Sequence, residues 1–172
     1  MRALRRGLDT LYDAAALLAA LCMVAMLGVI MAQMAARWMG VPFPGSSEYA
    51  GYLMASSAFL AFAHALNRGA HIRVNLLLTA LGPRRRLGEI WCMAIGTATA
   101  AYIAFYAIRL VYWSRLLNDI SQGQDETLLW LPQLPFAAGA VLLAIAFADN
   151  LVTLLATGQA NIRPATDGAP VE

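Results

Sequence analysis

Side chains that could carry enzymatic chemistry are few, and their spacing is not typical of a catalytic site. Ser56 and Ser57 are adjacent, but the nearest histidine, His64, follows about two helical turns later, too far to activate a serine hydroxyl. The only other histidine is His71, and both are expected near the same membrane face, so a transmembrane pair of axial haem ligands is not available. These residues therefore predict neither a serine nucleophile nor a haem site.

Metal and nucleotide sites are not indicated either. Cys22 and Cys92 both lie in apolar segments, which favours small core side chains over a disulfide or a thiolate metal site. No Gly-rich phosphate loop or spaced cluster of metal ligands is present. All 12 basic residues are arginines, and they are spread over several loops rather than gathered on one basic face, so nucleic-acid binding is not predicted. We expect a protein that is not an enzyme and binds no cofactor.

Three ionisable side chains remain candidates for a functional contact, although none lies at the centre of an apolar segment. Arg109 is near a segment end, where its long stem can reach lipid headgroups. Asp149 lies about a turn and a half inside the cytoplasmic end of the last segment, and it could pair with Arg68 or another cytoplasmic arginine, or meet a partner protein. Glu48 falls in the first turn of a predicted helix, where the helix dipole favours a carboxylate, or else it contacts a partner. Since charges that serve ion paths usually lie at mid-membrane depth, this chain is not predicted to form one.

The elements that position these residues are four long apolar segments. The 172 residues are 60% hydrophobic and 13% charged, whereas soluble domains carry about 25% charged residues. The segments cover about 14–36, 49–66, 90–113 and 134–155, each close to the ~20 residues that cross a bilayer as a helix. All four tryptophans fall at segment ends, as expected for the membrane interface. The sequence predicts an all-α membrane protein, with one four-helix domain over 1–156 and a flexible cytoplasmic tail over 157–172.

Small residues spaced by four indicate close helix packing within the membrane. They are Gly51 with Ala55, Gly96 with Ala100, and the series Ala140, Ala144 and Ala148. These pairs are expected to pack within the bundle or against another membrane protein.

The arginines also predict the orientation of the chain, because cytoplasmic loops retain positive charge during insertion. Nine arginines precede the first segment, lie between the second and third, or follow the fourth, and only two lie in the opposite loops. Both termini are therefore expected in the cytoplasm of a bacterium, with the chain in the inner membrane.

Residues 70–81, between the second and third segments, predict a short amphipathic helix. At ~1.5 Å per residue it is about 18 Å long, too short to cross hydrocarbon, and it should lie at the cytoplasmic membrane face. Its apolar face includes Leu77 and Leu78, its polar stripe begins at His71, and Arg73 can reach phosphates. The candidate contacts to a partner or to membrane phospholipids are Glu48, Arg68, His71, Arg73, Leu77, Leu78, Arg84, Arg85, Arg86 and Asp149.

Three stretches of the sequence resemble a known family. They are Glu48 at the start of the second segment, the run over 61–74 that contains Arg68, Gly69, Ala70, His71, Ile72, Arg73 and Val74, and the run over 127–139. Over about 10–156 the chain resembles the small membrane subunit, the Q-type small permease, of tripartite ATP-independent periplasmic (TRAP) transporters. Asn75, where many relatives have an acidic residue, departs from that pattern.

The resemblance implies a scaffold role beside a large permease subunit, in a system where a periplasmic solute-binding protein captures an organic acid and a sodium gradient drives its uptake. By the same resemblance, the substrate and sodium sites belong to the large subunit. Two alternatives remain. A self-contained four-helix exporter needs a membrane-embedded carboxylate, and Glu48 lies too near the outer end to serve easily. A membrane anchor for a redox enzyme needs haem or quinone ligands.

Overall fold

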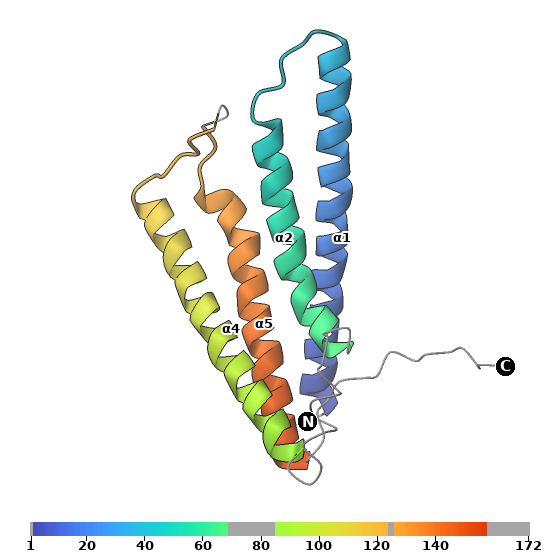
Figure 1. Cartoon of the computed structure of the whole chain (residues 1–172), viewed down its shortest axis with the longest axis vertical. Helices are drawn as coiled ribbons and strands as arrows, with labels where there is room; N and C mark the ends of the chain where they lie inside the picture. The colour runs from blue at the N-terminus through green and yellow to red at the C-terminus, as the bar shows by residue number, and fades with distance from the viewer. Residues whose placement is uncertain (1, 69–84, 124–125, 158–172) are drawn as a thin grey trace, which may run out of the picture.

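The computed structural model describes residues 2–68, 85–123 and 126–157, and most of them form four helices (Figure 1). These are α1 (Arg2–Trp38), α2 (Ser46–Asn67), α4 (Arg85–Leu116) and α5 (Trp130–Thr157). Each is long and apolar enough to cross a membrane, with mean hydropathy between 1.2 and 2.6 over its most apolar window. The prediction of an all-α protein with four transmembrane helices is confirmed. The predicted amphipathic helix over 70–81 and the predicted tail beyond Thr157 lie outside the described residues.

The four helices form a row rather than a closed bundle. α1 packs on α2, α2 packs on α5, and α5 packs on α4, so that α1 and α4 are the two edges. The pair α1 and α2 diverges from the pair α4 and α5 toward one end, as Figure 1 shows. We call this end the loop end, because it carries the connections 39–45 and 117–129. The opposite end, where α1 begins and α5 ends, is called the terminal end.

Small side chains form most of the core between neighbouring helices. Among the residues whose burial the structure describes, nine of the 14 buried apolar ones are alanines, and Ala63, Ala140 and Ala146 are almost completely inaccessible. Gly139 marks the closest approach of α5 to α2, since a Cβ atom there would lie 2.5 Å from the carbonyl carbon of Phe59. Gly96 likewise makes room for the Phe147 ring between α4 and α5.

Not every small-residue pair faces a neighbouring helix of the chain. Gly51 and Ala55 lie on the exposed side of α2, and a Cβ atom at Gly51 would meet nothing within 4 Å. Spacing by four therefore does not show by itself which face packs within the chain, because on α2 the face with Gly51 and Ala55 points outward.

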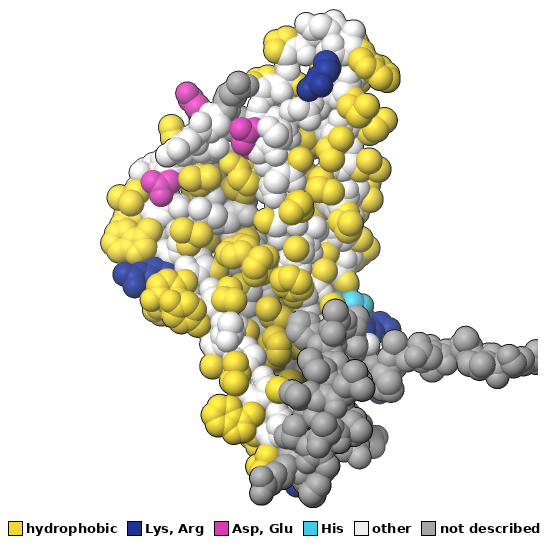
Figure 2. Space-filling view, in the orientation of Figure 1, with side chains coloured by type: hydrophobic (Ala, Val, Ile, Leu, Met, Phe, Trp, Pro, Cys, Tyr) yellow, Lys and Arg dark blue, Asp and Glu magenta, His cyan; other side chains and the backbone are white. Residues whose placement is uncertain are grey.

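Large apolar side chains cover the outside of the row (Figure 2). On α1 they include Leu17, Leu21, Val24 and Leu27, each more than half exposed. Such a surface is unfavourable in water and is suited to lipid tails or to another membrane protein.

Candidate functional site

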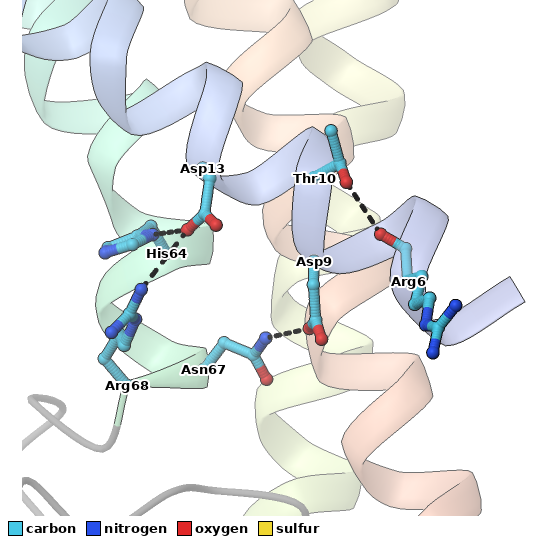
Figure 3. Close-up of polar contacts among 7 residues, drawn as sticks. All are labelled: Arg6, Asp9, Thr10, Asp13, His64, Asn67 and Arg68. Carbon is cyan, nitrogen blue, oxygen red and sulfur yellow. Dashed lines mark hydrogen bonds and ion pairs between the residues drawn. The ribbon is translucent and has the colours of Figure 1, made fainter. Parts of the chain in front are cut away.

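The terminal end carries a polar cluster that joins α1 to α2 (Figure 3). An oxygen of the Asp13 carboxylate lies 3.1 Å from His64 Nδ1 and 3.5 Å from Arg68 Nη2. Both Asp13 and Arg68 expose more than half of their side chains to the surroundings. Water or headgroups therefore screen this pair, and its contribution to stability is expected to be below about 1 kcal/mol.

A second layer of the same cluster is more deeply buried and includes α5. Asn67 Nδ2 donates a hydrogen bond to Asp9 at 3.2 Å. Beside it, Tyr12 is 2% exposed, and its hydroxyl has no hydrogen-bond partner among the described residues. On α5, Asn150 is equally buried and its amide donates to the Ala146 carbonyl at 2.8 Å. Half-buried Asp149 lies within electrostatic range of Tyr12, so three helices contribute polar groups here.

Of the candidate contact residues predicted from the sequence for this end, the structure describes Arg68, Asp149, Arg85 and Arg86. Arg68 ends α2 and pairs with Asp13, while Asp149 has no ion pair among the described residues. Arg85 begins α4, and Arg86 next to it is exposed. The remaining candidates lie outside the described residues, namely His71, Arg73, Leu77, Leu78 and Arg84.

Sequence reasoning missed the acidic members of this cluster. Asp9 and Asp13 are four residues apart, and they therefore share one face of α1 just before its apolar run. His64 and Arg68 show the same spacing across the end of the apolar segment 49–66 on α2. In an antiparallel helix pair joined by a short loop, these two positions come to the same depth, and this signal could have predicted the contact.

At the loop end, Glu48 lies in the first turn of α2, as its position in the sequence predicted. Ser47 Oγ donates to Glu48 Oε2 at 3.1 Å. The same side chain packs against Gly123 of the other loop, where a Cβ atom would lie 2.7 Å from Glu48 Oε1. Gly45 at the N-cap has no side chain that could accept a hydrogen bond from the first turn. The Glu48 carboxylate lies in that turn, where its negative charge interacts favourably with the helix dipole.

Hydroxyl groups of α2 hold the 117–129 loop in place. Tyr52 donates to Ser121 Oγ at 3.0 Å, and Ser121 Oγ also accepts from the Gly123 amide at 3.2 Å. The Tyr49 hydroxyl lies 3.2 Å from Thr127 Oγ1. Sequence reasoning missed both contacts, because the partners of Tyr49 and Tyr52 lie some 70 residues further along the chain.

A pocket of about 440 Å³ opens between the two loops, and its lining includes Gln33, Phe43, Ser46, Glu48 and Gln122. Glu48 is the one ionisable residue in the described lining. The pocket lies at the end of the helices rather than midway along them. It is therefore a surface feature of the loop end and not part of a path across the membrane.

Metal binding has no support in this arrangement, since no group of three or more suitable ligands occurs within the described ranges. No curated protein matches the sequence significantly. The family described as "Tripartite ATP-independent periplasmic transporters, DctQ component" matches residues 26–157, most of the chain and all or part of every helix. With four membrane-spanning helices and a match of this extent, the chain belongs to the DctQ family and is the small, multi-pass inner-membrane permease component of a TRAP transporter, not an enzyme.

Proposed function

We propose that this chain is the scaffold subunit of a sodium-coupled TRAP transporter for organic acid uptake, and that it supports the large permease without forming a solute path itself. The observation that carries the proposal is the open row of four helices. Its polar clusters lie at the two ends, and its long sides are mostly apolar. Sodium coupling and an organic acid substrate are what the family resemblance implies.

The orientation and the partners complete this proposal. The arginine asymmetry supports cytoplasmic termini, which places the loop end in the periplasm, where a solute-binding protein delivers its cargo. The large permease then covers part of the apolar sides, and membrane phospholipids cover the rest. The amphipathic pattern of 70–81 supports a helix along the cytoplasmic membrane face, anchored by the arginines at 84–86 at about 1 kcal/mol each on an anionic leaflet.

Transport by reconstituted components tests the proposal. Liposomes would contain this chain, the large subunit, or both, with the binding protein outside and radiolabelled dicarboxylates, sugar acids and keto acids as candidate solutes. Uptake is expected only with both membrane subunits and an inward sodium gradient, and a potassium gradient serves as the control.

Three outcomes would contradict separate parts of the proposal. Uptake by this chain alone would reject the scaffold role and favour the exporter. Equal uptake with potassium would reject sodium coupling. Sodium-driven uptake of a solute of another class, with none of the acids taken up, would reject the assignment of substrate class.

A further inference from the structure

The outer face of α4 carries two tyrosines and an arginine within the length of the helix that is apolar enough to cross a membrane. Tyr102, Tyr106, Arg109 and Trp113 follow one another at intervals of four, three and four residues, so they share one face of the helix. The face that packs on α5 includes buried Ala100, Ala104 and Ala107. At ~100° per residue the two faces lie about half a turn apart, and the tyrosines point away from the row.

Depth makes these tyrosines unusual. Trp91 and Trp113 on the same helix are separated by about 33 Å at ~1.5 Å per residue, which matches the thickness of the hydrocarbon layer. Tyr102 lies midway between them, and Tyr106 is one turn further on. Their side chains are 63% and 47% exposed, and neither hydroxyl has a partner within the described chain. A phenol prefers the membrane interface, and an unpaired hydroxyl in hydrocarbon is unfavourable.

The rings on this face support one another. The Tyr102 and Tyr106 ring centroids are 4.5 Å apart, and the Phe105 and Tyr106 centroids are 5.4 Å apart in an edge-to-face arrangement. Such contacts restrict the rotamers of the aromatic side chains and present a fixed surface. Aromatic residues and arginine are also the residue types enriched where proteins bind one another.

The other edge of the row shows what a lipid-facing helix of this chain looks like. From residue 14 to residue 32, α1 has no charged, hydroxyl or amide side chain, and Leu17, Leu21 and Val24 on it are exposed. This surface is apolar like lipid tails, and its side chains have no polar group that needs a hydrogen-bond partner. The contrast between the two edges indicates that α4 meets something other than lipid.

We infer that the outer face of α4 is the docking site for a transmembrane helix of the large permease subunit. The Tyr102 and Tyr106 hydroxyls donate to carbonyl or side-chain oxygens of that helix at mid-depth, and Arg109, which is also exposed, pairs with a carboxylate nearer the loop end. This inference rests on the proposed function, and it adds which face of the row the partner covers and what chemistry the partner presents. A carboxylate matches the positive charge of Arg109, which only donates hydrogen bonds. Oxygen acceptors match the O–H groups of Tyr102 and Tyr106, whose oxygens can also accept a hydrogen bond.

Photocrosslinking in the intact complex tests which face is covered. A benzophenone amino acid would replace Tyr102, with matched substitutions at Val24 on α1 and at Ala58 on the exposed side of α2. The crosslink to the large subunit is expected at position 102, with background yield at position 24. Crosslinks at 24 or 58 but not at 102 would overturn the α4 assignment while leaving the complex, and thus the proposed function, intact. Failure of the two unmodified subunits to copurify would instead count against the proposed function.

Removing the hydroxyl groups of Tyr102 and Tyr106 tests whether protein or lipid covers the outer face of α4. The double variant Tyr102→Phe/Tyr106→Phe keeps both rings, and losing two interhelical hydrogen bonds should lower the association constant with the large subunit by roughly fivefold. Tyr112→Phe, an exposed phenol at the interface, is the control and should leave it unchanged. If lipid covered α4, the double variant would assemble as well as the wild type or better, and that result would overturn the inference.

Discussion

Single hydrogen bonds at the loop end determine how the second loop lies against α2. The Tyr52 hydroxyl reaches Ser121, a buried residue in the 117–129 loop. Tyr49 and Thr127 form a second contact about one turn from the first. Glu48 also contacts Gly123, and together these contacts fix the part of the 117–129 loop that lines the pocket at the loop end. The order of this loop is therefore expected to depend on these three contacts.

The variant Tyr52→Phe isolates the first of these contacts. It removes the hydrogen bond to Ser121 but keeps the ring, and it should destabilise the loop contact by about 1 kcal/mol. Limited proteolysis of the detergent-solubilised subunit within 117–129 should become faster, and Tyr112→Phe should behave as the wild type. Identical cleavage rates for Tyr52→Phe and the wild type would show that the contact does not order the loop.

At this scale the sequence predicted positions better than partners. Glu48 lies in the first turn of α2, as predicted, and the prolines and glycines over 40–45 are local signals for a helix start just before it. Its contact with Gly123 depends on how two distant loops meet, and no local pattern records that. Asp13 and Arg68 are a different case, because the four-residue spacing on each helix and the short loop between α1 and α2 bring them to the same depth, so the sequence did carry a signal for this contact.

Between elements, the closest contact is the approach of α5 to α2 at Gly139. A methyl group there would lie 2.5 Å from the Phe59 carbonyl carbon and 2.8 Å from the Leu60 nitrogen. Both are backbone atoms, which cannot rotate away as the end of a side chain can. α2 and α5 would have to separate to accept it.

We therefore expect Gly139→Ala to destabilise the isolated subunit by about 1 to 3 kcal/mol, as overpacking usually does. The matched control is Gly51→Ala on α2, where the added methyl group meets open space and a helical alanine is favoured over glycine by up to ~1 kcal/mol. Denaturation in detergent, followed by circular dichroism, measures both. Equal stability of the two variants would mean that α2 and α5 do not approach so closely.

Helix existence followed from hydropathy, but helix length and order did not. The apolar run of α1 begins near residue 14, whereas the helix begins at Arg2. Its polar first turns are helical where Asp9 and Asp13 find partners on α2. The order α1, α2, α5, α4 across the row depends on which small-residue faces meet. Four-residue spacing does not identify these faces, because it occurs on an outward face of α2 as well as on a packed face of α5.

At the scale of the whole molecule, the row leaves both edges and much of both sides without protein cover. Narrow contacts built from alanine and glycine give each helix close neighbours but little buried area. Stability of the folded chain is therefore expected to depend on what covers these exposed apolar surfaces. This shape suits a subunit that widens a membrane assembly better than one that encloses a solute.

The orientation of the row is the property on which the partner assignments depend, and reporter fusions can measure it. Nine arginines lie before the apolar segment 14–36, between the segments 49–66 and 90–113, or after the segment 134–155. Only Arg37 and Arg115 lie beside the two connections at the loop end. Positive charge resists translocation, so a periplasm-dependent reporter should be active when fused at residue 120 and inactive at the C-terminus. A cytoplasm-dependent reporter should give the reverse result, and a fusion at residue 42 is the control for the first loop. Activity at 120 and at the C-terminus in one compartment would contradict four crossings, whereas a fully inverted pattern would keep the four crossings and overturn the orientation.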